Sequence, residues 1–387
     1  MKSLSKGLAI VALALSLRMA VVLLGTTNRD IDGQQLLANL VRTKINVYAA
    51  TDEFPYAPVS LWVPSQAAQA ARLLNLPFPV ADKIPVALAD ALIAGTIYTT
   101  LARTRPHSAF AWAAMYAVNP IALLLVSHGN LIVMPTLFML LAYTVLFNGV
   151  KENFRLSALL LGLAIGFRTF PILLLLPFLI KLPLSREQKV AYLLYATVPT
   201  ALSTIPFLIT DYHTILQDIL RYSGHNDFGP TAIVRAIQSI KAQRPLFTPI
   251  NPELASFAKG FFLASQVLLT ILLRKHRLID LVMLTWLLFY ALYVGVSAQY
   301  FIWILPFAFI AKDRLLPLFT ATGTAALASF YAIYHPNILF GRFTPPPFPI
   351  DALLYSEGIW LTALWLTCAA WALRLITQQP KRHEALI

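Results

Sequence analysis

The chain has 387 residues, of which 58% are hydrophobic and 12% charged, and its mean hydropathy is +0.69. This composition is far too apolar for a soluble domain and indicates a polytopic membrane protein. The net charge of +13 does not indicate nucleic-acid binding, because Lys and Arg form neither a patch nor a stripe interleaved with aromatic residues. The single cysteine, Cys368, excludes an intrachain disulfide and a cysteine-based metal site.

Apolar runs long enough to cross a bilayer recur along the chain. A hydrocarbon core of about 30 Å needs about 20 helical residues. We expect spans at residues 7–25, 84–102, 109–127, 131–148, 190–209, 256–273, 279–296, 314–334 and 357–375. With the shorter apolar segments, the pattern predicts an all-α membrane protein of about 10–12 transmembrane or half-crossing helices.

Basic residues cluster in the short connectors between these runs, and this gives an orientation. Cytoplasmic loops carry the excess of Lys and Arg, so we expect both termini in the cytoplasm and the long loops 26–83, 210–255 and 335–355 outside. The first run has no small-residue cleavage site and is expected to remain as a span. The short loops favour a prokaryotic plasma membrane.

Two apolar stretches carry basic residues at both ends and are predicted to be broken helices. In 156–180 the break falls at Arg168-Thr169-Phe170-Pro171, because proline lacks a backbone donor and disfavours helix at the preceding residue. In 279–311 it falls near Ser297 to Tyr300. Broken helices occur within membranes where they line a cavity, so we expect a cavity that opens to the outside.

Asp30 and Asp32 in the first outer loop are the candidate catalytic pair. In an extended segment, residues two apart project to the same side about 7 Å from each other, so two carboxylates could share a divalent ion or act as base and orienter. The alternative is a solvated loop in which Asp30 caps a helix over residues 33–42. On this triplet alone the solvated loop is the favoured interpretation, and the catalytic one depends on its context.

Arg168 is the candidate ligand for a phosphate. A charged residue at membrane depth costs about 2.5–3.5 kcal/mol and should have a partner, and a guanidinium can donate two parallel hydrogen bonds to a phosphate. The alternative is an internal salt bridge that holds the broken helix.

Further polar residues fall on the predicted outer side and are candidates for contact with a substrate. His128 and Asn130 lie in a turn between two spans, and His225 lies in the loop 210–255. Gln299 and Tyr300 lie at the second break. A plain turn, a solvated loop and the interfacial aromatic belt are the respective alternatives.

These motifs, taken in order, resemble a known group of enzymes. The first loop is similar to the opening loop of the GT-C superfamily of polyprenyl-phosphate-sugar-dependent glycosyltransferases. The whole ordered set most resembles the glycosylphosphatidylinositol mannosyltransferase I family and its prokaryotic relatives. The matching segments are residues 30–32, 44–48, 55–58, 119–120, 127–130, 162–171 and 297–306.

The resemblance implies a reaction and roles for individual residues. One of Asp30 and Asp32 would be the general base toward the acceptor hydroxyl, and the sugar would be transferred with inversion from a polyprenyl phosphate to a lipid-linked or glycan acceptor. Arg168 would bind the donor phosphate. His128, Asn130, His225, Gln299 and Tyr300, together with Tyr48 and Tyr56 of the first loop, would contact substrates. A divalent cation, Mg²⁺ or Mn²⁺, is possible in this superfamily but not required, and the metal stays open.

The resemblance covers roughly residues 7–311, so we expect a catalytic module over 1–311 and C-terminal helices with a short tail over 312–387. The chain departs from the family pattern at three positions. It has His128-Gly129 where the family has Arg-Gly, Arg168 where it has Lys, and Gly33 where it has Tyr. These departures leave the donor sugar, with mannose as one candidate, and the acceptor open.

Two other function classes fit part of the pattern. A secondary transporter or flippase of a lipid-linked sugar would also have broken helices around a cavity, but we find no internal repeat. A glycan polymerase or ligase would rely on basic residues of outer loops without an Asp pair. The sequence lacks a Walker-type phosphate loop, a His-Glu-x-x-His motif and a Gly-x-Ser-x-Gly elbow.

Overall fold

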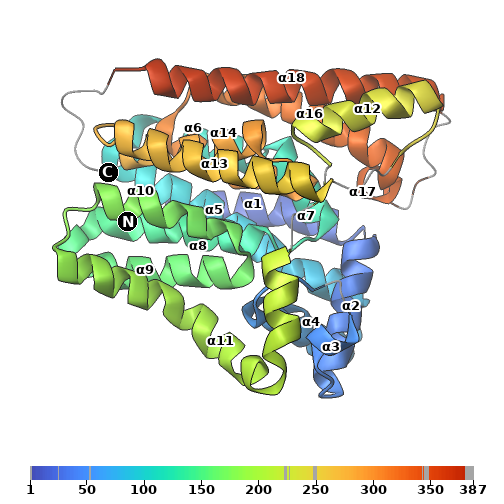
Figure 1. The fold of residues 1–387 in the computed structure, drawn as a ribbon, viewed down its shortest axis with the longest axis horizontal. Helices are drawn as coiled ribbons and strands as arrows, with labels where there is room; N and C mark the ends of the chain where they lie inside the picture. Colours follow the sequence, from blue (N-terminus) through green and yellow to red (C-terminus); the bar gives the residue numbers. More distant parts are fainter. Residues whose placement is uncertain are drawn as a thin grey trace. The chain divides into compact units, whose positions relative to one another are not determined.

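The computed structural model describes residues 2–24, 26–51, 54–221, 225, 227–246, 251–341, 343 and 348–379. Over these residues the chain is almost wholly helical (Figure 1). The all-α prediction is therefore confirmed. The chain forms two compact units. Unit 1 comprises residues 1–118, 125–175 and 182–222, and unit 2 comprises residues 119–124, 176–181 and 223–387. The predicted division at residue 311 stays a prediction.

Unit 1 contains the N-terminal helices and the long helix α11. Its α-helices are α1 (Lys2–Val22), α2 (Arg29–Arg42), α3 (Val47–Ala50), α4 (Trp62–Leu74), α5 (Phe78–Thr104), α6 (Pro106–Ala117), α8 (Val133–Thr144), α9 (Val150–Phe167) and α11 (Arg186–Arg221). Its 3-10 helices are η1 (Pro58–Leu61), η2 (Val145–Asn148) and η3 (Phe170–Leu174). Figure 1 shows α2, α3 and α4 gathered beside the C-terminal part of α11. The predicted outer loop 26–83 is thus largely helical.

Unit 2 contains the C-terminal helices. They are α12 (Pro230–Ala242), α13 (Pro252–Leu272), α14 (Leu278–Leu292), η4 (Ala298–Ile302), α15 (Leu305–Ala311), α16 (Leu316–Tyr334), α17 (Pro336–Phe340) and α18 (Ile350–Thr377). Two helices, α7 (Pro120–His128) and α10 (Leu175–Lys181), run from one unit into the other along the chain. Within unit 2, Arg235 of α12 donates to the Glu357 carboxylate of α18 at 2.7 Å, and both side chains are buried.

Six helical segments of the described chain are long and apolar enough to cross a membrane. They are Leu4–Val22, Phe78–Thr104, Arg186–Ile209, Pro252–Leu272, Leu316–Tyr334 and Ile350–Thr377. The helices Pro106–Ala117 and Pro120–His128, which meet at a bend of 42°, make a seventh if they are counted as one span. The prediction of a multi-pass membrane protein is confirmed. The segments predicted as spans at 131–148 and 279–296 form shorter apolar helices, Val133–Asn148 and Leu278–Leu292.

Both predicted helix breaks are present. Helix α9 ends at Phe167, Arg168 has extended backbone (φ −151°, ψ 137°), and the chain resumes in η3 and α10. Helix α14 ends at Leu292, and the chain resumes in η4 and then α15. The first break leaves the Arg168 side chain at the end of α9 instead of on a helix face.

A buried ion pair ties the first helix to the rest of unit 1. Arg18 of α1 donates through Nε to Oδ2 of Asp90 of α5 at 2.6 Å, and neither side chain is exposed. The Tyr116 hydroxyl donates to the other Asp90 oxygen at 2.5 Å, and the Arg18 guanidinium also donates to the Ala117 carbonyl. These bonds compensate the cost of two charges within the apolar helices.

Removal of one member of this pair should destabilise the protein strongly. For Arg18→Met we expect a loss of about 3–5 kcal/mol in the free energy of unfolding, because the buried Asp90 carboxyl loses its counter-ion. Arg18→Met combined with Asp90→Leu should recover most of that loss. The measurement is unfolding in detergent micelles, with Arg103→Met as the control, since Arg103 is exposed and donates to Asn148. If Arg18→Met is as stable as the Arg103→Met control, the ion pair does not stabilise the protein as described.

Candidate active site

The Asp-Ile-Asp triplet lies in the first turn of a helix. Asn28 caps α2, because its side-chain oxygen accepts hydrogen bonds from the backbone nitrogens of Asp30 (3.0 Å) and Ile31 (3.2 Å). The extended conformation expected for the triplet is therefore wrong, and so is the helix start at Gly33. Residues two apart on a helix point about 200° from each other, so Asp30 and Asp32 project in different directions.

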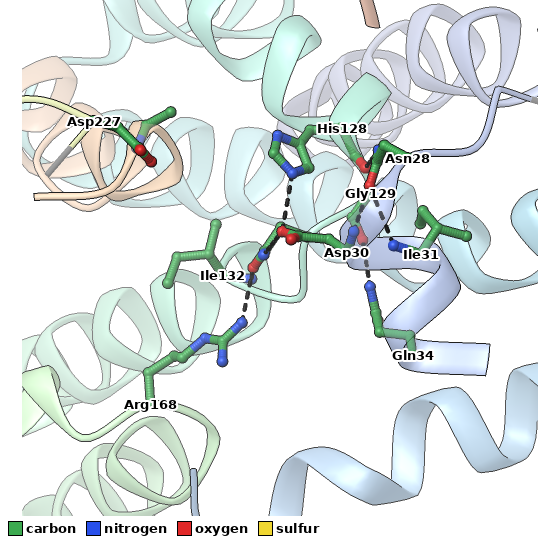
Figure 2. A network of polar contacts seen from close by, with 11 residues as sticks. Asn28, Asp30, Ile31, Gln34, His128, Gly129, Ile132, Arg168 and Asp227 are labelled. Atoms are coloured by element: carbon green, nitrogen blue, oxygen red, sulfur yellow. Dashed lines mark hydrogen bonds and ion pairs between the residues drawn. The ribbon is translucent and has the colours of Figure 1, made fainter. Parts of the chain in front are cut away.

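Asp30 is at the centre of a hydrogen-bonded cluster. Its Oδ2 accepts from Nδ2 of Asn130 at 2.6 Å and lies 2.9 Å from Nε2 of His128 (Figure 2). The Asp30 side chain is 36% exposed, whereas that of His128 is 6% exposed. One aspartate at the start of α2 thus meets the turn after α7, about one hundred residues later in the chain.

Asp32 lies outside this cluster. It is exposed, and its Oδ1 accepts from the hydroxyl of Thr27 at 2.7 Å. The structure therefore separates two residues that the sequence treats alike.

Asn130 connects Asp30 to Arg168. Its Oδ1 accepts from the Ile132 backbone nitrogen at 3.1 Å and from the Arg168 guanidinium at 2.9 Å (Figure 2). An amide oxygen accepts and an amide nitrogen donates, so these two bonds fix the orientation of the Asn130 amide and direct its nitrogen at Asp30.

Arg168 is buried and held from two sides. Besides its bond to Asn130, its guanidinium lies 3.6 Å from the ring centroid of Tyr56, a cation–π contact. The Tyr48 hydroxyl donates to the Tyr56 backbone oxygen at 2.6 Å. Tyr48 and Tyr56 were predicted to contact substrate, which stays a prediction; their observed contacts hold Tyr56 against Arg168.

The turn that presents His128 and Asn130 depends on Gly129. Its φ is +79°, a value that favours glycine, and a Cβ at this position would lie 2.6 Å from the Ile31 side chain and 2.8 Å from that of Lys83. Gln34 donates to the Gly129 carbonyl at 3.3 Å, and Asn28 donates to the His128 carbonyl at 2.7 Å. Helix α2 and the turn are thus joined through backbone and side chains.

The surroundings of Asp30 favour its ionised form. Burial raises the pKa of a carboxyl, but here the His128 contact, the hydrogen bond from Asn130 and the positive charge of Arg168 outweigh burial. Together they hold the pKa of Asp30 well below its ordinary value. Asp30 is therefore an anion at neutral pH, and a carboxylate anion accepts hydrogen bonds but donates none.

The remaining predicted contacts belong to unit 2. Gln299 and Tyr300 lie in η4, where the buried Tyr300 ring stacks on Trp303 with centroids 4.4 Å apart. His225 is exposed. Their predicted contact with substrate stays a prediction.

Two functional neighbours, Asn28 and Gln34, were missed at the sequence level. Asn28 carries a recognisable signal, because an Asn that precedes an acidic first turn is a common N-cap. Gln34 carries none, since its role depends on the distant turn at Gly129.

Within the part of the chain that the structure describes, no three His, Cys, Asp or Glu side chains form a metal-binding group. A divalent cation stays a prediction.

Comparison with known proteins gives a distant match to a glycosyltransferase. No family model matches the chain. A relative named GPI mannosyltransferase 1, from Candida albicans, is 25% identical over 236 residues, which are 56% of this chain and 58% of the relative. The match thus spans little more than half of each protein. It supports a relationship to membrane glycosyltransferases.

Replacement of Gly129 should disrupt the cluster without touching its side chains. We expect Gly129→Ala to lower the thermal midpoint, because alanine is strained at φ +79° and its Cβ would overlap Ile31 and Lys83. The matched control is Gly260→Ala, where an added Cβ meets nothing within 4 Å. That variant should be unchanged or slightly more stable, since alanine favours helix. Equal thermal midpoints for the two variants would contradict the assigned role of Gly129.

Proposed function

We propose that the protein is a membrane glycosyltransferase that moves a hexose, with mannose as the first candidate, from a polyprenyl-phosphate donor to a lipid-linked or glycan acceptor. Transfer would occur with inversion and on the extracytoplasmic face. The observation that carries the proposal is the Asp30 cluster, in which a solvent-reachable carboxylate and a buried guanidinium are linked through one amide. The similarity to a protein named as a mannosyltransferase supports it.

The cluster has the two charges that such a reaction needs. An acceptor hydroxyl must lose a proton, and the negative charge of the Asp30 carboxylate favours that loss. The departing polyprenyl phosphate gains a negative charge, which the Arg168 guanidinium would stabilise. The phosphate is already a good leaving group, so positioning supplies most of the acceleration.

The contacts of Arg168 favour phosphate binding over the alternative of an internal salt bridge. Among the described residues, no carboxylate lies within ion-pair distance of Arg168, and its partners are the neutral Asn130 amide and the Tyr56 ring. A buried cation held by neutral groups retains the capacity to bind an anion. This observation favours a transferase, or a carrier of a phosphate-linked sugar, over a glycan polymerase that relies on basic outer loops.

Transfer should depend on Asp30 far more than on Asp32. With protein reconstituted in liposomes and radiolabelled polyprenyl-phosphate-mannose or its glucose analogue, we expect Asp30→Asn to slow transfer about 100-fold or more. For Asp32→Asn we expect a decrease in the transfer rate that is at least about tenfold smaller, because Asp32 is exposed and bonds to Thr27. Undiminished transfer by Asp30→Asn would refute the proposal. Movement of the intact donor across the bilayer without transfer would favour the flippase.

Cysteine labelling tests the proposed orientation. In a Cys368→Ala background, a membrane-impermeant maleimide should label Gln69→Cys from outside and should fail to label Lys151→Cys until the membrane is opened. Both positions are exposed, so burial does not explain a difference between them. The reverse pattern would place the Asp30 cluster on the cytoplasmic side.

A further inference from the structure

We propose that Lys83 is a positioning residue of the candidate site. It holds the connection between α1 and α2 against the Gly129 turn and thereby sets where Asp30 and His128 lie relative to each other. The inference rests on the transfer reaction proposed above, and the role it adds is exerted through other residues instead of through contact with a substrate. Three observations carry it: the bonds of the Lys83 ammonium, the path of its side chain past Gly129, and the bonds that Asn28 makes to Asp30 and His128.

The Lys83 ammonium is buried in unit 1 and is bonded to a single residue. Its Nζ donates to the backbone oxygen of Thr26 at 2.7 Å and to the Thr26 hydroxyl at 3.0 Å, and the Lys83 side chain is fully buried. Thr26 is itself 7% exposed, and Lys83 is the one described residue that donates to its backbone oxygen. A buried carbonyl needs a donor, so the connection between α1 and α2 depends on this ammonium for its hydrogen bonding.

Hydrogen bonds to Thr26, and not an ion pair, determine where the ammonium lies. The preceding residue, Asp82, is also fully buried and interacts electrostatically with Lys83. Neither Asp82 oxygen, however, has a hydrogen-bond partner among the described residues. Asp82 therefore does not hold the ammonium in place, and the two Thr26 oxygens do.

The Lys83 side chain runs close to the turn that presents His128 and Asn130. A Cβ atom at Gly129 would lie 2.8 Å from Cγ and 2.9 Å from Cε of Lys83. The methylene stem thus lies directly against the turn while the ammonium reaches Thr26. One side chain thereby contacts both chain segments that carry the cluster, the connection before α2 and the turn after α7.

Asn28 transmits the position of Thr26 to the cluster. It lies two residues after Thr26, and its side-chain oxygen accepts from the Asp30 backbone nitrogen at 3.0 Å (Figure 2). Its side-chain nitrogen donates to the His128 carbonyl at 2.7 Å. A shift of the connection therefore changes the position of Asp30 relative to His128. A displacement of about 1 Å in a reacting geometry can cost about 100-fold in rate.

The decisive variant is Lys83→Met, which keeps a stem of similar length and has no donor for Thr26. We expect kcat per folded protein to fall about 10- to 100-fold for transfer from radiolabelled polyprenyl-phosphate-mannose to a membrane lipid extract. The KM for the donor should change less than about threefold, because the phosphate is assigned to Arg168, whose described partners are Asn130 and Tyr56. A loss confined to the donor KM would overturn the proposal.

The matched control is Ser157→Ala, which removes buried hydrogen bonds elsewhere in unit 1. The Ser157 hydroxyl donates to the Ala142 carbonyl at 2.7 Å and lies 3.1 Å from the Tyr192 hydroxyl. We expect this variant to unfold at a lower temperature and to keep the wild-type kcat per folded protein, with the folded fraction measured by near-UV circular dichroism. If Lys83→Met behaves in the same way, Lys83 serves stability alone and the proposal is overturned.

Variants of Thr26 test the same link from its other end, and they decide the question if Lys83→Met does not fold. Thr26→Val removes the hydroxyl and keeps the carbonyl, so we expect kcat to fall about 3- to 10-fold. Thr26→Ser retains the hydroxyl and should restore kcat to within about twofold of the wild type. Added to Lys83→Met, Thr26→Val should cause little further loss, because the ammonium that bonds to the hydroxyl is already absent. Equal kcat values for Thr26→Val and Thr26→Ser would overturn the proposal.

A measurement without turnover separates this inference from the proposed function. In protein labelled with ¹⁵N at its seven histidines, the signals that disappear in His128→Gln belong to His128. We expect Lys83→Met to shift these signals and Ser157→Ala to leave them at their wild-type positions. If they shift while the wild type transfers no sugar, the proposed function fails and the positioning role stands. If they do not shift in Lys83→Met, the inference is overturned even when transfer is confirmed.

Discussion

The side-chain amide of Asn130 is the interaction on which the candidate site depends. It accepts from Arg168 and from the Ile132 backbone with one end and donates to Asp30 with the other. It therefore brings together the start of α2, the turn after α7 and the end of α9. Without this amide, the Asp30 carboxylate and the Arg168 guanidinium would no longer share a hydrogen-bonding partner. A leucine of similar size would leave Arg168 with the Tyr56 ring alone among its described contacts.

The residues of the cluster lie where helices begin or end. Backbone groups inside a bilayer must be satisfied within the protein, so polar side chains are best presented from turns and breaks that the protein itself covers. The turn at Gly129 and the end of α9 at Phe167 are such places, and each is followed by a residue of the cluster. Elsewhere in unit 1, Arg18 and Asp90 form a buried ion pair within the spans. Two kinds of buried charge thus coexist, one paired for stability and one held by neutral groups at the site.

Much of the fold was predictable because its signals are local. Run length and hydropathy indicate the long helices, and Pro171 with its basic flanks indicates the break at Arg168. The conformation of the Asp30 triplet was not predicted correctly, because the decisive residue, Asn28, acts as a cap and was read as part of a loop. The pairing of Asp30 with His128 and Asn130 links residues about one hundred positions apart, and no local pattern encodes such a contact. For the same reason, the difference between Asp30 and Asp32 could be seen only in three dimensions.

The central claim is that Asp30 and its partners act as one unit, and a double-mutant cycle tests it most directly. The measurement is kcat/KM for sugar transfer by the wild type, Asp30→Asn, Asn130→Leu and the double variant. Residues that act together lose their function together, so the double variant should be no more than slightly worse than the poorer single variant. If the two losses multiply instead, Asp30 and Asn130 contribute independently, and the cluster is not the catalytic unit described here.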